Sequence, residues 1–123
     1  MTNRLILDTD GGIDDAQALL LLIANGRAPA AITTVFGNVE LDAATRNVLA
    51  TLAVVGADIP VHKGTAEPVV QDLIHAKHVH GEDGLGGAPR PGKTDDVAGQ
   101  AKAVGADEIF SSQTIGGVVV ILI

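Results

Sequence analysis

The sequence predicts an α/β fold in which a mainly parallel sheet is flanked by helices. Short apolar or β-branched runs alternate with longer segments rich in Ala and Leu. A glycine follows each of the first two helical segments, as expected of a helix C-terminus. Because a strand–helix–strand–helix–strand order requires crossover connections, neighbouring strands should run parallel in a Rossmann-like arrangement. The 123 residues suit one domain.

The first predicted strand is the apolar run Leu5–Leu7, which ends at an aspartate. Ile13–Asn25 is predicted to be a helix, with two acidic residues in its first turn and Gly26 as its C-cap. Ala30–Phe36 is rich in β-branched residues and is predicted to be the second strand. Ligands of such sheets bind at the carboxyl ends of the strands, which directs attention to the residues that follow each strand.

The remaining elements are predicted with the same signals. Leu41–Val55 reads as a helix ended by Gly56, and Ile59–His62 as a short strand. Residues 66–93 are rich in His, Gly, Pro and charge, and are predicted to be a surface loop with one helical turn. Asp95–Val104 is expected to be helical, and Val118–Ile123 to be a last buried strand.

Composition excludes several classes of protein. The net charge of −7 disfavours contact with phosphate backbones, and the 2% aromatic content leaves no platform for base stacking, so no nucleic-acid partner is expected. The absence of Cys excludes disulfides, thiolate nucleophiles and cysteine metal sites. No signal peptide or membrane-length apolar segment is evident. We therefore expect a cytoplasmic protein that does not bind membranes.

The densest chemical signal is a cluster of four aspartates directly after the first strand: Asp8, Asp10, Asp14 and Asp15. Like charges this close repel one another unless something compensates, and hard divalent cations take carboxylate ligands. Gly11 and Gly12 permit the tight turn that would fold the acids together. The plainer alternative is that Asp14 and Asp15 only favour the helix N-terminus while Asp8 caps the turn. We interpret the cluster as a metal or catalytic site.

Two further segments are candidates. Asn38 follows the second strand and could offer a donor and an acceptor to a substrate hydroxyl, although Gly-Asn alone usually marks a turn. His80 begins a glycine-rich loop that ends at Gly87 and could approach a ligand from it. A zinc site at His75, His78 and His80 is disfavoured, because the spacing lacks a helical pair or cysteine support. The plainer reading is solvent-exposed loop histidines.

Together these segments resemble the inosine–uridine-preferring nucleoside hydrolase family. Its aspartate motif DTDPGIDDA corresponds to Asp8–Ala16, its TTVFGN strand to Thr33–Asn38, its ATRNAL helix to Ala44–Leu49, and its glycine loop to His80–Gly87. Four separated motifs in the right order are specific, and the resemblance extends over about residues 3 to 91. It implies a Ca²⁺-dependent enzyme that hydrolyses the N-glycosidic bond of ribonucleosides.

The resemblance also implies roles. The residues matching Asp10 and Asp15 bind Ca²⁺, and Asp10 is the general base that takes a proton from the attacking water. Asp14 and Asn38 hydrogen-bond the ribose hydroxyls, His80 belongs to a loop that covers the pocket, and Asp8 orients the others. A ribonucleoside substrate and a homo-oligomer are the implied partners.

Two departures from the family pattern stand out. Gly11 replaces the usual proline, which loosens the turn before Asp14. Family members are more than twice as long, so we expect this chain to correspond to their truncated N-terminal portion and to turn over slowly or not at all. The apolar ending Gly116–Ile123 then resembles an interior strand cut at its functional end.

Two other hypotheses remain open. Leu5–Gly11 also resembles the first motif of the haloacid-dehalogenase phosphatases, in which Asp8 would be the nucleophile, Asp10 the acid/base group and Mg²⁺ the metal. That family does not account for Asn38 or His80. The third hypothesis is a non-catalytic fragment that acts as an interaction module through an exposed sheet edge.

Overall fold

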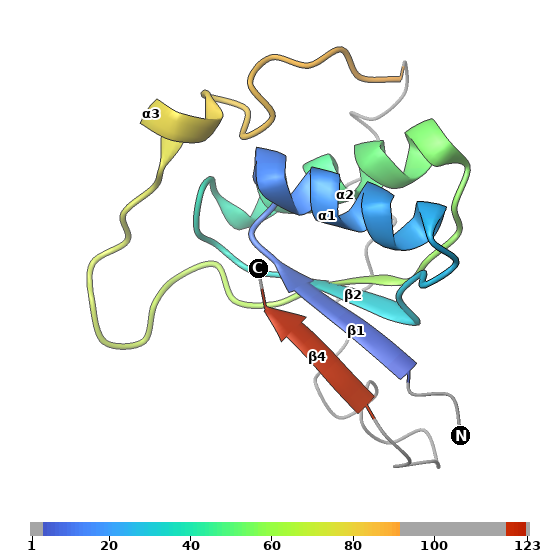
Figure 1. Cartoon of the computed structure of the whole chain (residues 1–123). Coiled ribbons are helices and arrows are strands. Elements are labelled where there is room, and N and C mark those ends of the chain that lie inside the picture. Colours follow the sequence, from blue (N-terminus) through green and yellow to red (C-terminus); the bar gives the residue numbers. More distant parts are fainter. Residues whose placement is uncertain (1–3, 92–117, 123) are drawn as a thin grey trace.

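The computed structural model describes residues 4–91 and 118–122, and these form a parallel α/β unit (Figure 1). Its strands are hydrogen-bonded in the order β3-β2-β1-β4, and every neighbouring pair runs parallel. The predicted fold class is therefore confirmed. The elements are β1 (Arg4–Thr9), α1 (Ile13–Ala24), β2 (Ala31–Thr34), α2 (Leu41–Val55), β3 (Val61–Lys63), α3 (Lys77–His80) and β4 (Val118–Leu122).

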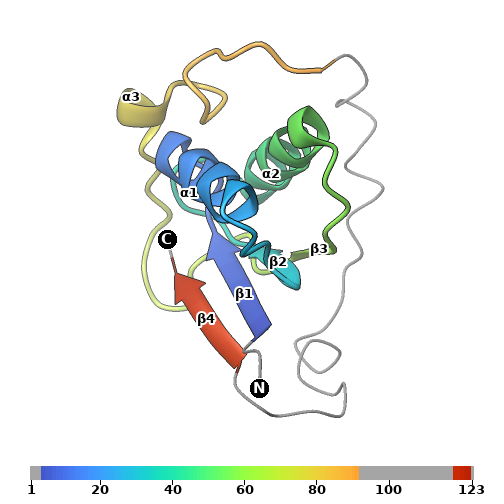
Figure 2. The ribbon, with the colours of Figure 1, turned by 45° about the vertical axis from the view of Figure 1, so that its right-hand side comes forward.

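Helices α1 and α2 lie side by side over one face of the sheet (Figures 1 and 2). The register places Leu7, Ile32 and Val61 in one row across β1, β2 and β3. The two helices cover this row with Leu19 of α1 and with Val48 and Leu52 of α2, and all six side chains form one buried cluster. Burial of these apolar side chains fixes the position of both helices on the sheet.

The helix ends follow the predicted signals closely. The bounds of α2 are those predicted, and Gly56 ends it in the left-handed conformation at φ 65°. Helix α1 ends at Ala24, one residue earlier than predicted, and its C-cap is Asn25. Gly26 lies one position further on at φ 69°, where a glycine is favoured after a helix.

The strand ends differ more from the predictions. Strand β1 extends to Thr9, which pairs with Thr34 of β2 and whose side chain is buried in spite of its hydroxyl. Strand β2 stops at Thr34, although the N–H of Val35 still donates to Thr9 O over 3.1 Å. Strand β3 begins only after Pro60, since proline has no N–H for the ladder.

The predicted loop contains the single helical turn that was expected, at α3. Residues 92–93 at the end of that loop, and the expected helix Asp95–Val104, lie outside the described residues. Strand β4 pairs with β1, so Leu122 lies opposite Asp8. Among the described residues, no helix combines the length and apolar character that crossing a membrane requires.

Candidate active site

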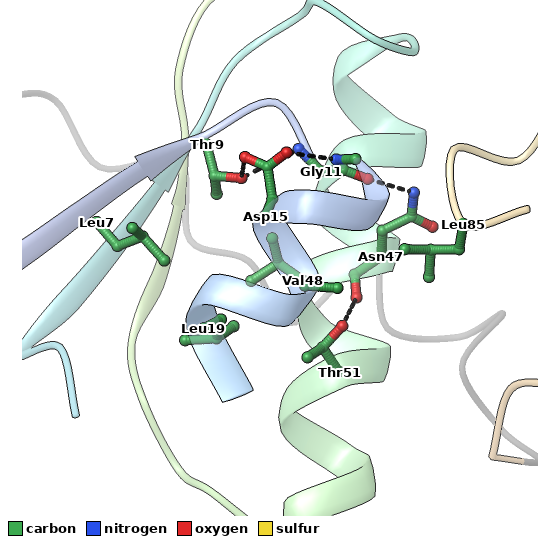
Figure 3. A pocket seen from close by; sticks show the side chains of 11 residues that line it. Leu7, Thr9, Gly11, Asp15, Leu19, Asn47, Val48, Thr51 and Leu85 are labelled. Carbon is green, nitrogen blue, oxygen red and sulfur yellow. Dashed lines mark hydrogen bonds between the residues drawn. The ribbon is translucent and has the colours of Figure 1, made fainter. Parts of the chain in front are cut away.

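A buried carboxylate, that of Asp15, lies against the turn between β1 and α1 (Figure 3). Asp15 is only 3% exposed, and one of its oxygens accepts the Thr9 hydroxyl. Its other oxygen accepts the N–H of Gly12 over 2.9 Å, as an acid at the third helical position does in a capping box. The N–H of Gly11 donates to the same Thr9 hydroxyl over 3.1 Å. Asp15 is thereby held against the turn that precedes it.

Asp10 and Asn38 bind each other across the carboxyl ends of β1 and β2. The backbone N–H of Asn38 donates to Asp10 Oδ2 over 2.9 Å, and its side-chain amide donates to Asp10 Oδ1 over 2.7 Å. A Cβ at Gly37 would collide with the Asp10 carboxylate, so the close approach requires glycine there. The two strand ends therefore meet at one site, as the parallel-sheet rule predicts.

His80, the last residue of α3, reaches the turn between β1 and α1. This turn, residues 10–12, is called the aspartate turn. Its Nδ1 accepts the N–H of Ile13 over 3.1 Å, and it lies 3.9 Å from Asp14 Oδ1. The acceptor role of Nδ1 leaves Nε2 as the protonated nitrogen of the neutral ring. The side chain of His80 is 14% exposed and that of Asp14 is 69% exposed. His80 is therefore no freely exposed loop histidine, whereas Asp14 is open to solvent.

The separate motifs converge on Gly12. A Cβ at this position would contact Asn38 Nδ2, His80 Nδ1 at 2.8 Å and Asp15 Oδ2 at 2.9 Å. These three residues come from the second strand's end, the glycine-loop segment and the first helix. Their side chains surround Gly12, so residues that are distant in the sequence form a single site.

Asp8 belongs to strand β1 and not to the turn that follows it. It lies within β1, opposite Thr33 of β2, and its Oδ1 accepts the Thr33 hydroxyl. His75, the other candidate histidine near the site, bonds the carbonyl of Gly37 over 2.9 Å. The first contact joins side chains of β1 and β2, and the second holds the backbone next to Asn38.

The electrostatics of the turn disfavour the ionised form of Asp15. Burial raises the pKa of Asp15, and the charges of Asp10 and Asp14 raise it further, although the hydrogen bonds from Thr9 and Gly12 oppose the rise. Carboxylate oxygens are the ligands that Ca²⁺ prefers. Within residues 4–91 and 118–122, no group of three or more His, Asp or Glu side chains could hold a metal. The described residues alone therefore do not assemble the complete set of side-chain ligands that the resemblance implies.

Sequence reasoning missed three residues that shape the site. Thr9 binds Asp15, Asn47 of α2 binds the turn at Gly11, and Asp83 organises the glycine loop by accepting the N–H groups of Leu85 and Gly87. Asn47 is 1% exposed. A polar residue on the buried face of a helix needs a hydrogen-bond partner, and this is the signal that could have identified Asn47.

Comparison with known proteins identifies the family. The sequence profile described as "Inosine-uridine preferring nucleoside hydrolase" matches residues 5–122. The chain belongs to this family. The resemblance seen in the four motifs is confirmed, and it extends through β4.

Individual relatives agree with this assignment. The chain is 46% identical over 93 residues to the pyrimidine-specific ribonucleoside hydrolase RihA of Shewanella oneidensis, covering 74% of this chain and 29% of that protein. It is 46% identical over 85 residues to the non-specific ribonucleoside hydrolase RihC of Salmonella agona, covering 68% of this chain and 28% of that protein. A solved inosine-guanosine nucleoside hydrolase superposes with a TM-score of 0.77 at 31% identity, over 98% of this chain and 39% of the other.

This nucleoside hydrolase family member thus spans less than a third of the length of the two curated relatives. The coverage is consistent with the expected correspondence to a portion of a longer family member. The family assignment also favours the nucleoside hydrolase hypothesis over the phosphatase hypothesis for the aspartate motif.

Proposed function

We propose that this chain carries the ribose-binding and cation-binding residues of a Ca²⁺-dependent ribonucleoside hydrolase. The observation that carries the proposal is the convergence of Asn38, His80 and Asp15 around Gly12, beside the carboxylate of Asp10. The relatives include enzymes described as pyrimidine-specific, non-specific and inosine-guanosine hydrolases. Because these descriptions share the ribonucleoside and differ in the base, the substrate class proposed is the ribonucleoside.

Asp10 is the proposed general base. Its two oxygens accept hydrogen bonds from Asn38, which fix the plane of the carboxylate and leave further lone pairs for a water molecule. A proton passes from the attacking water to the Asp10 carboxylate as the water oxygen bonds to the anomeric carbon. The bond between the anomeric carbon and the base nitrogen breaks, and the electron pair leaves with the base.

The other residues bind and enclose the substrate in this proposal. Asp14 is open to solvent and accepts a hydrogen bond from a ribose hydroxyl, and Asn38 binds a second hydroxyl. His80 holds its loop against the N-terminus of α1, where the loop would limit access of water. Asp8 supports the strand beneath the site through Thr33.

Asp10 and Asp15 are the residues that would hold Ca²⁺. A buried carboxylate beside two other acids is the observation that fits such an ion, because the ion would offset their mutual repulsion. When bound, the ion lowers the pKa of a coordinated water and positions it.

The test measures ribose release from inosine and from uridine, and thermal stability, each with Ca²⁺ and with chelator. We expect Ca²⁺ to raise the unfolding temperature and to be required for ribose release at high protein concentration. Asp10→Asn should abolish both effects. Asp42→Asn is the matched control, because Asp42 is an exposed acid paired with Lys63 away from the site. A protein that shows neither Ca²⁺-dependent stabilisation nor ribose release would overturn the proposal.

A further inference from the structure

Asn47 connects two parts of the site that are far apart in the sequence. Its side-chain Nδ2 donates to Gly11 O over 2.9 Å and to Asp83 O over 2.8 Å. Gly11 belongs to the aspartate turn, and Asp83 belongs to the part of the glycine loop that follows α3, residues 81–87. Figure 3 shows the amide beside Gly11 and close to Leu85 of that loop.

The orientation of this amide is fixed by its two partners. Both are carbonyl oxygens, so only the nitrogen end of the amide can face them, and each of its two N–H groups serves a different loop. The oxygen end, Oδ1, is buried and has no hydrogen-bond partner among the described residues. Burial of an unpaired acceptor is unfavourable, so the two bonds made by the nitrogen decide how the side chain sits.

Both loops are packed tightly around Asn47. A Cβ at Gly84 would lie 2.7 Å from Asn47 Nδ2, and Gly84 has a φ of 82°, so the loop approaches the amide in a conformation that favours glycine. A Cβ at Gly11 would lie 2.5 Å from the Cα of Ala44, one turn of α2 before Asn47. Neither the aspartate turn nor the glycine loop has room to move toward α2, and each is hydrogen-bonded to α2 by the Asn47 side chain.

The contact reaches the buried carboxylate in two steps. Asn47 holds the carbonyl of Gly11, and the next residue, Gly12, donates its N–H to Asp15 Oδ2. On the other side, Asp83 Oδ1 accepts the N–H groups of Leu85 at 3.0 Å and Gly87 at 3.1 Å, which shape the glycine loop.

We propose that Asn47 is a positioning residue that couples the glycine loop to the aspartate turn, so that a displacement of the loop changes the hydrogen bond between Gly12 and Asp15. The effect of this coupling on turnover rests on the proposed hydrolase function. The coupling itself does not, because it depends only on contacts within the chain.

A double-mutant cycle tests the coupling through the exchange rate of the Gly12 amide proton. Asp83→Ala removes the side chain that shapes the glycine loop without touching the aspartate turn. With Asn47 present, we expect it to speed Gly12 exchange about tenfold, the size of one lost hydrogen bond. In the Asn47→Leu background, we expect the same change to alter Gly12 exchange by less than about twofold. Asn47→Ala serves as a second background should the leucine variant not fold.

Thr45→Val is the matched control background. Thr45 is a buried polar residue of the same helix, and its hydroxyl bonds Thr34 of β2 and the carbonyl of Leu41 rather than either loop. Asp83→Ala should still speed Gly12 exchange in this background. If Asp83→Ala changes Gly12 exchange equally with and without Asn47, or not at all, the proposal is wrong.

The kinetic measurement adds the functional consequence. Asn47→Leu should lower kcat for ribose release at least about tenfold while Thr45→Val leaves it near that of the wild type. Coupled exchange in a protein without ribose release would keep the proposal for Asn47 and contradict the hydrolase function. Ribose release without coupled exchange would keep the proposed hydrolase function and contradict the proposal for Asn47.

Discussion

At the scale of single residues, Gly12 decides whether the site can assemble. Its φ of −81° is accessible to any residue, so its requirement for glycine is one of space alone. A methyl group there would press on the side chains of Asn38, His80 and Asp15 together. We expect Gly12→Ala to lower stability by about 1–3 kcal/mol, as overpacking does, and to abolish any Ca²⁺-dependent stabilisation. Urea unfolding with and without Ca²⁺ measures both effects.

Gly26→Ala is the control for this prediction. Gly26 has a φ of 69°, and a Cβ there meets no atom within 4 Å. The substitution should cost about 1–2 kcal/mol through backbone conformation and leave the response to Ca²⁺ unchanged. Loss of the Ca²⁺ response in both variants would show that general destabilisation, and not crowding at Gly12, disturbs the site.

At the scale of elements, an ion pair joins α3 to the start of α2. Lys77 Nζ donates to Glu40 Oε1 over 2.7 Å, and this bond lowers the pKa of Glu40 below its ordinary value of 4.5. A carboxyl with a lowered pKa stabilises the fold above pH 4.5, and the contribution is lost as pH falls through the folded-state pKa. Both side chains are partly exposed, so the effect should be small and weakened by salt.

Lys77→Met should therefore return the pKa of Glu40 toward 4.5. Side-chain carboxyl shifts in an NMR titration measure this directly. Lys63→Met is the reciprocal control, because Lys63 lowers the pKa of Asp42 through a separate bond of 2.7 Å. Each lysine variant should change the pKa of its own partner only. A pKa of Glu40 that does not change in Lys77→Met would contradict the pairing.

The elements also show how far the sequence could predict the fold. The bounds of helix α2 could be predicted, because its helix-forming residues and the glycine that ends it, Gly56, are local signals in the sequence. Strand β1 continues to Thr9, which pairs with Thr34 of β2 and binds Asp15 through its hydroxyl, and such tertiary contacts leave no local pattern. The acids, Asn38 and His80 could be predicted from their motifs. The role of Asn47 could not, since its two partners lie 36 residues away on either side.

At the scale of the whole molecule, one apolar cluster joins the sheet to both helices. Ile32 is fully buried at the centre of the row between Leu7 and Val61. Ile32→Ala should destabilise the protein by about 2–5 kcal/mol in chemical denaturation, with helix and sheet signals lost in one transition. Val69→Ala is the control, because Val69 is 96% exposed, and it should change stability by no more than about 0.5 kcal/mol. Equal effects of the two substitutions would contradict this description of the core.

The buried carboxylate of Asp15 links the stability of the molecule to its proposed function. Burial and the nearby acids raise the pKa of Asp15 above 3.8, so folding disfavours the ionised form of this carboxylate. This penalty is fully present above the folded-state pKa and disappears as pH falls below 3.8. An asparagine can still accept the Gly12 N–H and donate to Thr9, without the charge.

Asp15→Asn should therefore raise the unfolding temperature of the metal-free protein at pH 7, by an amount on the order of 4 °C. Added Ca²⁺ should stabilise the wild type and leave Asp15→Asn unchanged, because the variant lacks the carboxylate that would bind the ion. Asp42→Asn, which removes an exposed acid already stabilised by Lys63, should not raise the unfolding temperature. A lower unfolding temperature for metal-free Asp15→Asn would mean that its hydrogen bonds outweigh its repulsion, and that the turn is organised for structure rather than for a cation.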